Sequence, residues 1–218
     1  MLERVLFDFY NLLFIAVSLL TAVTIHEYAH ARTALYFGDD TAKMYGRLTL
    51  NPLKHIDPIG AIMLIIFRFG WAKPVPINPR NFTNYKQGTL WVSLAGPLSN
   101  IALAIIVAIL ARLLLFLPLP FVALAILDRL FNLLIIYNIF FAIFNMIPVP
   151  PLDGSKVLGM LLPPKYSYYY SQYMGQIEQY GFWVLILLVA TGALSTLMSP
   201  FIRIFMVLMG LIKGAPIF

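Results

Sequence analysis

Long apolar runs separated by short polar stretches dominate the chain. Four such runs carry few charges, at about 6–37, 88–117, 121–147 and 181–198. A helix needs about 20 apolar residues to cross a hydrocarbon core about 30 Å thick, and each run approaches or exceeds that length. The pattern therefore predicts four transmembrane helices, and Pro118 with Pro120 predicts a tight turn between the second and the third.

The segment between the first two runs breaks this pattern. Residues 59–69 are apolar but too few to span, and the alternation at 44–50 and 71–77 is typical of strands. Non-helical backbone at membrane depth must be covered by protein or line a wet cavity. We therefore predict a membrane re-entrant segment of short strands and turns at about 40–85.

The last third of the chain alternates between polar and apolar stretches. A short helix is predicted at about 153–162, and a polar, Tyr-rich connector follows at 163–180. Ser199 and Pro200 are expected to end the fourth span, because proline cannot continue the hydrogen bonding of a helix. Residues 201–213 are then expected either to span or to lie at the interface.

Composition supports a membrane protein. Of the 218 residues, 61% are hydrophobic and 11% are charged, whereas soluble domains carry about a quarter charged residues. We predict an all-α polytopic membrane protein with one domain over residues 1–218 and the lipid bilayer as its surroundings. Since the chain has no cysteine, any metal must be held by His, Asp or Glu.

The net charge of +6 is concentrated between the first two spans. Such a cluster marks a cytoplasmic segment under the positive-inside rule, so the N-terminus is predicted to lie outside. This topology signal explains the basic charge without nucleic acid as a partner. The N-terminus lacks the positive n-region and small-residue cleavage site of a signal peptide, which favours a prokaryotic plasma membrane. The basic residues concerned are Lys43, Arg47, Lys54, Arg68, Lys73, Arg80 and Lys86.

One short motif inside the first predicted span suggests a metal centre. His26, Glu27 and His30 form H-E-x-x-H, and residues four apart lie on one face of a helix, where two imidazoles can hold one Zn²⁺. Ionisable residues at membrane depth are costly and are functional candidates by default. The third histidine, His55, falls in the polar segment and is expected to be a solvated loop residue.

A hydrolytic zinc site usually has three protein ligands and one water. Asp153 is the best remaining acidic candidate, because the third span ends at prolines just before it and the expected depth matches that of His30. An alternative role for Asp153 is that of an N-cap for the short helix that follows. The other acidic residues lie near the outer end or in segments where solvent is available.

Three motifs occur in the order found in one family. HEYAH at 26–30, AGPLSN at 95–100 and FNMIPVPPLDG at 144–154 resemble the site-2 proteases, the intramembrane zinc metalloproteases of peptidase family M50. The resemblance covers nearly the whole chain, in a minimal form without PDZ or CBS domains. It implies that His26, His30 and Asp153 bind Zn²⁺ and that Glu27 is the catalytic base. GWAKPVP at 70–76 is similar to the family's membrane re-entrant β-hairpin.

The resemblance implies a zinc-dependent intramembrane endopeptidase that cleaves a transmembrane helix of a membrane-protein substrate, with its active site towards the cytoplasm. Asn100 would line the site beside zinc, either as a substrate-binding donor to the oxyanion or as a helix–helix hydrogen bond. The alternative function is a zinc-binding scaffold or transporter without proteolysis. A transporter is expected to show ligands at several depths and repeated halves, which this sequence lacks.

Overall fold

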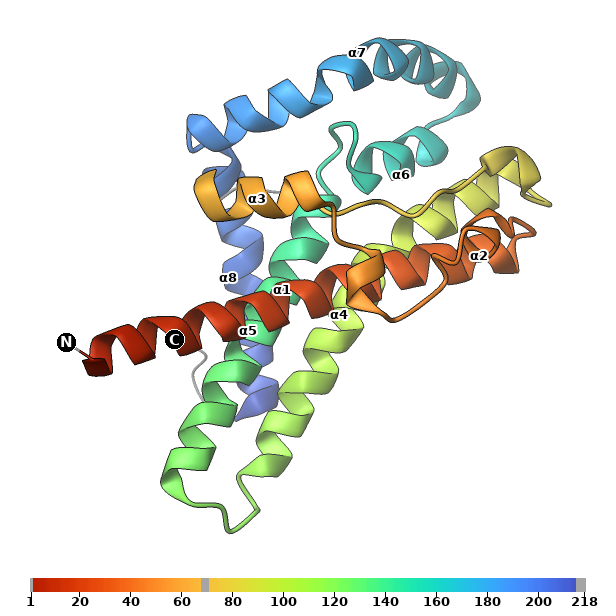
Figure 1. Cartoon of the computed structure of the whole chain (residues 1–218). Coiled ribbons are helices and arrows are strands. Elements are labelled where there is room, and N and C mark those ends of the chain that lie inside the picture. The colour runs from red at the N-terminus through yellow and green to blue at the C-terminus, as the bar shows by residue number, and fades with distance from the viewer. Residues whose placement is uncertain (1, 68–70, 215–218) are drawn as a thin grey trace.

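The computed structural model describes residues 2–67 and 71–214, most of which are helical (Figure 1). The all-helical class predicted from the sequence is therefore confirmed. The elements in chain order are α1 (Leu2–Tyr36), α2 (Thr41–Met44), the 3₁₀ turn η1 (Pro52–Lys54), α3 (Pro58–Phe67), the 3₁₀ turn η2 (Pro79–Asn81), α4 (Tyr85–Leu114), α5 (Phe121–Asn145), α6 (Asp153–Leu161), α7 (Pro164–Ala190) and α8 (Ala193–Lys213).

Four of the described helices are long and apolar enough to cross a membrane: Tyr10–Tyr36, Tyr85–Leu114, Phe121–Asn145 and Ala193–Lys213. The first three coincide with predicted spans. The predicted fourth span at 181–198 is wrong, because it straddles the boundary between α7 and α8. Gly192 lies at that boundary with φ of 73°, a left-handed conformation that glycine adopts without steric cost.

Pro200 lies inside α8 rather than at its end. A proline cannot donate to the carbonyl four residues earlier, here that of Thr196. The Ser199 hydroxyl donates to this carbonyl over 3.2 Å, and such side-chain replacement lets proline sit inside membrane helices. Residues 201–213 therefore belong to a candidate span.

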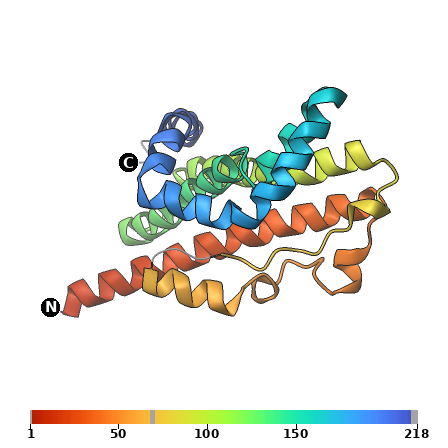
Figure 2. The same cartoon turned by 90° about the horizontal axis from the view of Figure 1, so that it is seen from above.

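The Tyr-rich stretch is helical as well. Residues predicted to form a connector make up the first half of α7, which begins at Pro164, a position where the fixed φ of proline suits a helix start. α7 runs across the ends of α5 and α8 rather than alongside them (Figures 1 and 2). It is not among the candidate spans of the described chain.

The predicted re-entrant β-hairpin is not supported. Among the described residues of segment 40–85, β-pairing is limited to one isolated bridge between Ile56 and Ala72, and the apolar stretch forms α3 instead. Residues 68–70 lie outside the described residues. Pro74 and Pro76 lack the N–H that a strand ladder requires, so residues 71–78 pass α1 without becoming a strand (Figure 2).

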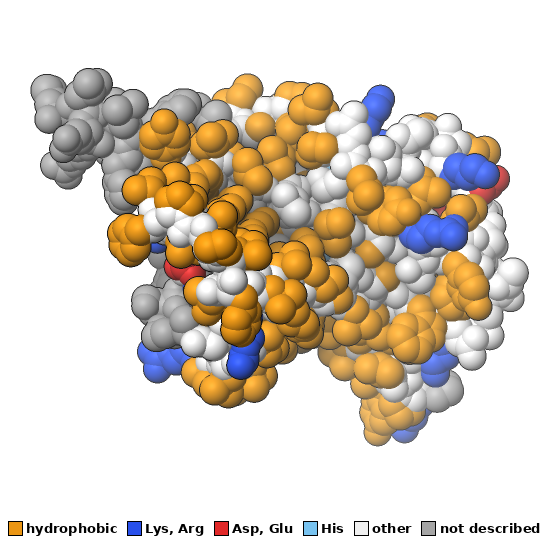
Figure 3. Space-filling model, turned by 90° about the horizontal axis from the view of Figure 1, so that it is seen from below, with side chains coloured by type: hydrophobic (Ala, Val, Ile, Leu, Met, Phe, Trp, Pro, Cys, Tyr) orange, Lys and Arg blue, Asp and Glu red, His pale blue; other side chains and the backbone are white. Residues whose placement is uncertain are grey.

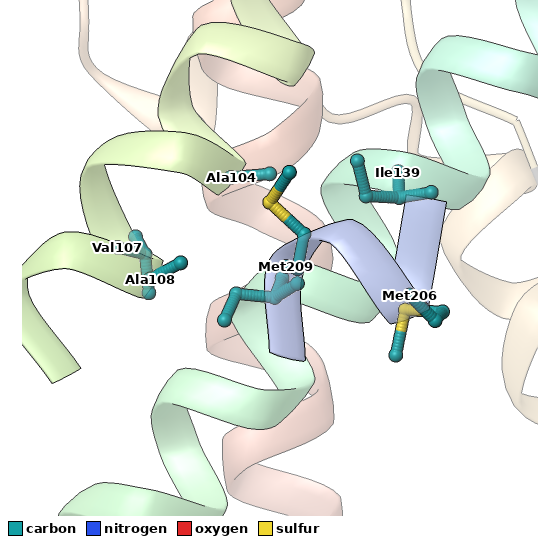
Figure 4. Close-up of a cluster of buried hydrophobic side chains, with 7 residues drawn as sticks. Ala104, Val107, Ala108, Ile139, Met206 and Met209 are labelled. Carbon is teal, nitrogen blue, oxygen red and sulfur yellow. The ribbon is translucent and has the colours of Figure 1, made fainter. Parts of the chain in front are cut away.

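Small side chains let the spanning helices approach closely. Ala104 and Ala108 of α4 are fully buried against Met206 and Met209 of α8 and Ile139 of α5 (Figure 4). α4 also packs against α1, α5 and α6. This central helix therefore reaches each element that contributes to the site described below.

The outer surface is strongly apolar. Hydrophobic side chains cover much of the face shown in Figure 3, and large side chains such as Phe121 and Leu211 are more than half exposed. An apolar surface of this extent is unusual for a soluble monomer. It fits a chain whose helices face lipid.

Candidate metal centre

Two helices far apart in the sequence bring three metal-binding side chains together. His26 and His30 project from one face of α1, and Asp153 is the first residue of α6; all three are buried. Their ligand atoms lie within 4.8 Å of one another. The structure therefore gathers the residues that the sequence singled out, and we call them the metal group.

The geometry of the metal group suits zinc. Asp153 Oδ2 lies 3.2 Å from His26 Nε2 and 3.0 Å from His30 Nε2, and the two Nε2 atoms are 3.0 Å apart. Tetrahedral zinc with bonds of about 2.0–2.1 Å has ligands separated by about 3.3 Å. The three donor atoms therefore form a triangle of nearly the right size for one zinc ion.

Hydrogen bonds on the far side of each imidazole set its tautomer. His30 Nδ1 lies 2.6 Å from the carbonyl oxygen of Val92, which can only accept, so Nδ1 carries the proton. His26 Nδ1 lies 2.7 Å from Asn100 Oδ1. Both Nε2 atoms therefore face the centre with a lone pair, which is the arrangement usual for metal-bound histidines.

Asp153 completes this electron-rich centre. Burial opposes the charged carboxylate, but in the metal-free site a protonated His30 ring and hydrogen bonds from the two histidines outweigh it and hold the pKa of Asp153 well below its ordinary value. Asp153 is not the N-cap of α6, a position held by Leu152. When both rings are neutral, two imidazole lone pairs and a carboxylate meet at about 3 Å and repel one another unless a cation lies between them.

Gly96 of α4 makes room for the metal group. A Cβ added at this glycine would lie 2.5 Å from His30 Nε2 and 2.6 Å from His26 Nε2, closer than real Cβ contacts. The absence of a side chain at Gly96 therefore leaves the space that the two imidazole rings occupy. Sequence reasoning missed this role because it depends on how α4 crosses α1.

Glu27 lies next to the metal group and outside its triangle. Its Oε2 accepts a hydrogen bond of 2.8 Å from the backbone N–H of Val75. In the stretch Pro74-Val75-Pro76, only Val75 has an N–H to donate. The segment after α3 therefore fixes the orientation of the Glu27 carboxylate.

Asn100 is fully buried beside His26. Its Nδ2 donates to the carbonyl of Ala22 over 2.9 Å and to Asn138 Oδ1 over 2.8 Å. Both donors of the amide are thus used within the protein, as expected of a residue that joins helices. Asn138 of α5 was not singled out from the sequence; a polar residue in the middle of an apolar span is the signal that points to it.

His55 does not join the metal group. It is 1% exposed, and its Nε2 lies 2.9 Å from the carbonyl of Thr49. The expectation of a solvated loop histidine is therefore wrong, because the turns before α3 fold over this ring. Its contacts are those of a structural residue.

Comparisons with known proteins agree with this geometry. Residues 120–189 match the model of "Peptidase family M50". The chain is 40% identical over 192 residues to the Bacillus subtilis (strain 168) protein named "Putative zinc metalloprotease YwhC", with 87% of this chain and 86% of that protein covered. It is 31% identical over 181 residues to "Putative zinc metalloprotease Rip2" of Mycolicibacterium smegmatis, with 81% and 66% covered. No solved structure gives a significant match.

A helical membrane fold with a buried His-His-Asp centre defines a membrane metallohydrolase. The chain belongs to peptidase family M50, the site-2 proteases. It is thus a zinc metalloprotease and a multi-pass membrane protein with Zn²⁺ as its cofactor.

Proposed function

We propose that this enzyme hydrolyses peptide bonds within transmembrane segments of membrane proteins, with His26, His30 and Asp153 as zinc ligands and Glu27 as the general base. One observation carries the proposal: three metal donors converge, and two of them lie with Glu27 on a helix that is itself a candidate membrane span. A hydrolytic centre on such a helix acts on peptide bonds that lie at membrane depth.

Each residue near the centre has a separate chemical task. Zinc, when bound, polarises the scissile carbonyl and makes water a stronger acid. Glu27 takes a proton from the attacking water and delivers it to the leaving nitrogen. Val75 holds Glu27 Oε2, so that the carboxylate keeps one orientation during this transfer. Asp153 contributes the negative charge that a divalent cation requires.

The substrate is a transmembrane helix that opens locally before cleavage. In a helix every interior carbonyl accepts an internal hydrogen bond, and the backbone is shielded by side chains. The scissile carbonyl must therefore leave the helix to reach the metal group. This requirement favours substrates whose spans contain weak helix formers, such as glycine and proline, near the cut.

The same proposal includes the orientation of the enzyme. Basic residues between α1 and α4 favour a cytoplasmic position for that segment, with the N-terminus outside and the site towards the cytoplasm. The relatives come from bacteria, which favours a prokaryotic plasma membrane. Since α1 and α6 supply the ligands jointly, the whole chain works as one catalytic domain.

The test compares wild type, Glu27→Gln and Glu178→Gln for zinc content and for cleavage of a model single-span membrane protein in liposomes. Glu178 is an exposed residue of α7, so the same change there is a matched control. We expect about one zinc per chain in all three proteins. Cleavage is expected in wild type and Glu178→Gln and is expected to be lost in Glu27→Gln.

Other outcomes separate the alternatives. Zinc in every protein with no cleavage of any single-span substrate would favour a scaffold without proteolysis. Vesicle flux of zinc in the absence of cleavage would favour a transporter. Absence of zinc from the wild-type protein would contradict the proposed ligand set.

A further inference from the structure

A line of hydrogen bonds runs from the backbone of α5 to a zinc-facing ring on α1. Asn138 Nδ2 donates to the carbonyl of Leu134 over 2.8 Å. Asn138 Oδ1 accepts from Asn100 Nδ2 over 2.8 Å, and Asn100 Oδ1 lies 2.7 Å from His26 Nδ1. Both asparagines are fully buried, so water does not compete for these bonds.

The carbonyl of Leu134, at the end of the line farthest from His26, determines which group donates and which accepts in each hydrogen bond. A backbone carbonyl only accepts, so the Asn138 amide must turn its NH₂ to Leu134 and its oxygen to Asn100. Asn100 must then present its NH₂ to Asn138 and to the carbonyl of Ala22. Its remaining oxygen faces His26, which places the ring proton on Nδ1 and leaves the lone pair of Nε2 for a metal.

The two histidines reach the same tautomer by different means. His30 Nδ1 meets the backbone carbonyl of Val92, whose polarity cannot reverse. His26 Nδ1 meets a side-chain amide, which can turn over and offer a donor instead. In that reversed state the ring proton would move to Nε2 and His26 could not bind zinc. The His26 ligand thus depends on the two groups that hold the Asn100 amide nitrogen, the carbonyl of Ala22 and Oδ1 of Asn138.

We propose that Asn138 is a positioning residue for zinc binding, which acts with the Ala22 carbonyl to fix the Asn100 amide so that His26 presents an unprotonated Nε2. The inference rests on the proposed zinc ligand set and adds a residue on a third helix. Asn138 touches neither the metal position nor Glu27 by any hydrogen bond among the described residues. Its effect is therefore expected in metal affinity and in the His26 tautomer.

The experiment measures zinc release from the full-length, zinc-loaded protein to a strong chelator. Asn138→Leu keeps the branched arrangement of side-chain heavy atoms and removes both bonds, and we expect release about tenfold faster, the lower end of the effect of losing an outer partner of a metal ligand. Asn138→Asp is expected to release zinc at nearly the wild-type rate, since burial favours a neutral carboxyl, which can donate to Leu134 and accept from Asn100.

Asn132→Leu is the matched control. Asn132 lies on the same helix and bonds to Lys213 and Asp128, so its loss weakens contact between helices without touching the line to His26. Its zinc release is expected to match wild type. Equal acceleration in Asn132→Leu and Asn138→Leu would overturn the proposal, because it would mean general loosening of the bundle.

A second readout follows the tautomer directly. The chain has three histidines, so ¹⁵N-labelled rings give a simple NMR spectrum of the metal-free protein. We expect Asn138→Leu to shift one ring towards the Nε2–H form, whereas an unchanged spectrum with unchanged release would overturn the proposal. Asn138→Ser, which is too short to reach Asn100, replaces Asn138→Leu if the latter does not fold. Wild type without zinc would instead contradict the proposed ligand set itself.

Discussion

The backbone N–H of Val75 donates a hydrogen bond of 2.8 Å to the carboxylate of Glu27, 48 positions earlier in the chain. This bond joins the irregular segment after α3 to the helix that carries the proposed zinc ligands. Arg47 anchors the same segment by donating to the carbonyl of Lys73 over 2.6 Å. The loop is therefore part of the site.

Replacement of Val75 by proline tests this contact. Val75→Pro removes the N–H, so the Glu27 carboxylate loses its fixed orientation, and we expect cleavage to fall by about tenfold to a hundredfold because small misplacements of a catalytic group are costly. Zinc content should stay at the wild-type value. Val75→Ala keeps the N–H and is the control; a similar loss of cleavage in both variants would assign the effect to side-chain packing.

Gly96→Ala is expected to abolish stable zinc binding. The added Cβ would lie 2.5 Å from His30 Nε2, so either the rings or α4 must move, and overpacking of this kind costs about 1–3 kcal/mol. Zinc per chain, measured after dialysis, should drop well below that of wild type. Gly175→Ala is the matched control, because its Cβ would meet nothing within 4 Å. Full zinc retention in Gly96→Ala would contradict the close packing described here.

Asp39 makes stability depend on pH. It is fully buried, and burial opposes its charge, but hydrogen bonds from Thr41, Asn78 and Asn81 outweigh this and lower the pKa of the carboxyl. A lowered folded-state pKa contributes stability above the ordinary carboxyl pKa of about 3.9, and this stability is lost as the pH falls through the folded-state value.

Asp39→Asn should therefore lower the free energy of unfolding at pH 7 by about 1.5–3 kcal/mol, the range for hydrogen bonds to a charged group. The difference from wild type should shrink as the pH falls below about 4. Thermal unfolding in detergent across this pH range measures it. Asp40→Asn, at the exposed neighbouring position, should change stability by no more than about 0.5 kcal/mol. A pH-independent effect of Asp39→Asn would rule out the charge as its cause.

A buried lysine fixes the end of α8. Lys213 is 2% exposed, and its Nζ lies 2.5 Å from Asp128 Oδ1 and 2.7 Å from Asn132 Oδ1. Asp128→Asn leaves this ammonium group without its counter-ion, and since Asp128 is about half exposed we expect a loss of about 1–2 kcal/mol, less than for a fully buried pair. The double variant with Lys213→Met should recover part of the loss. Additive losses would show that the pair does not interact.

The sequence predicted the parts of the site that depend on local geometry. His26 and His30 meet because a helix places residues four apart on one face, and Asp153 stood out as an acidic residue at the end of a span. Gly96 could not be found in this way, since its role arises where α4 crosses α1, and the polar character of Asn138 in an apolar span marks the residue without revealing its partner on α4. Such crossings are set by packing between distant segments.

The errors in the predicted fold have equally specific causes. Alternating residues at 71–77 suggested a strand, but Pro74 and Pro76 remove the donors of a ladder. Pro200 suggested a helix end, but the Ser199 hydroxyl satisfies the freed carbonyl. In both places a local hydrogen-bonding detail decided the structure. The missing proline N–H groups prevented a strand, and the Ser199 hydroxyl allowed the helix to continue.

The ligands of the metal group come from opposite halves of the chain, and 127 positions separate His26 from Asp153. During synthesis, a nascent chain that has delivered α1, α4 and α5 to the membrane holds the two imidazoles and Glu27 but lacks the Asp153 ligand. Hydrolytic competence therefore arrives late in translation, when α6 docks against α4.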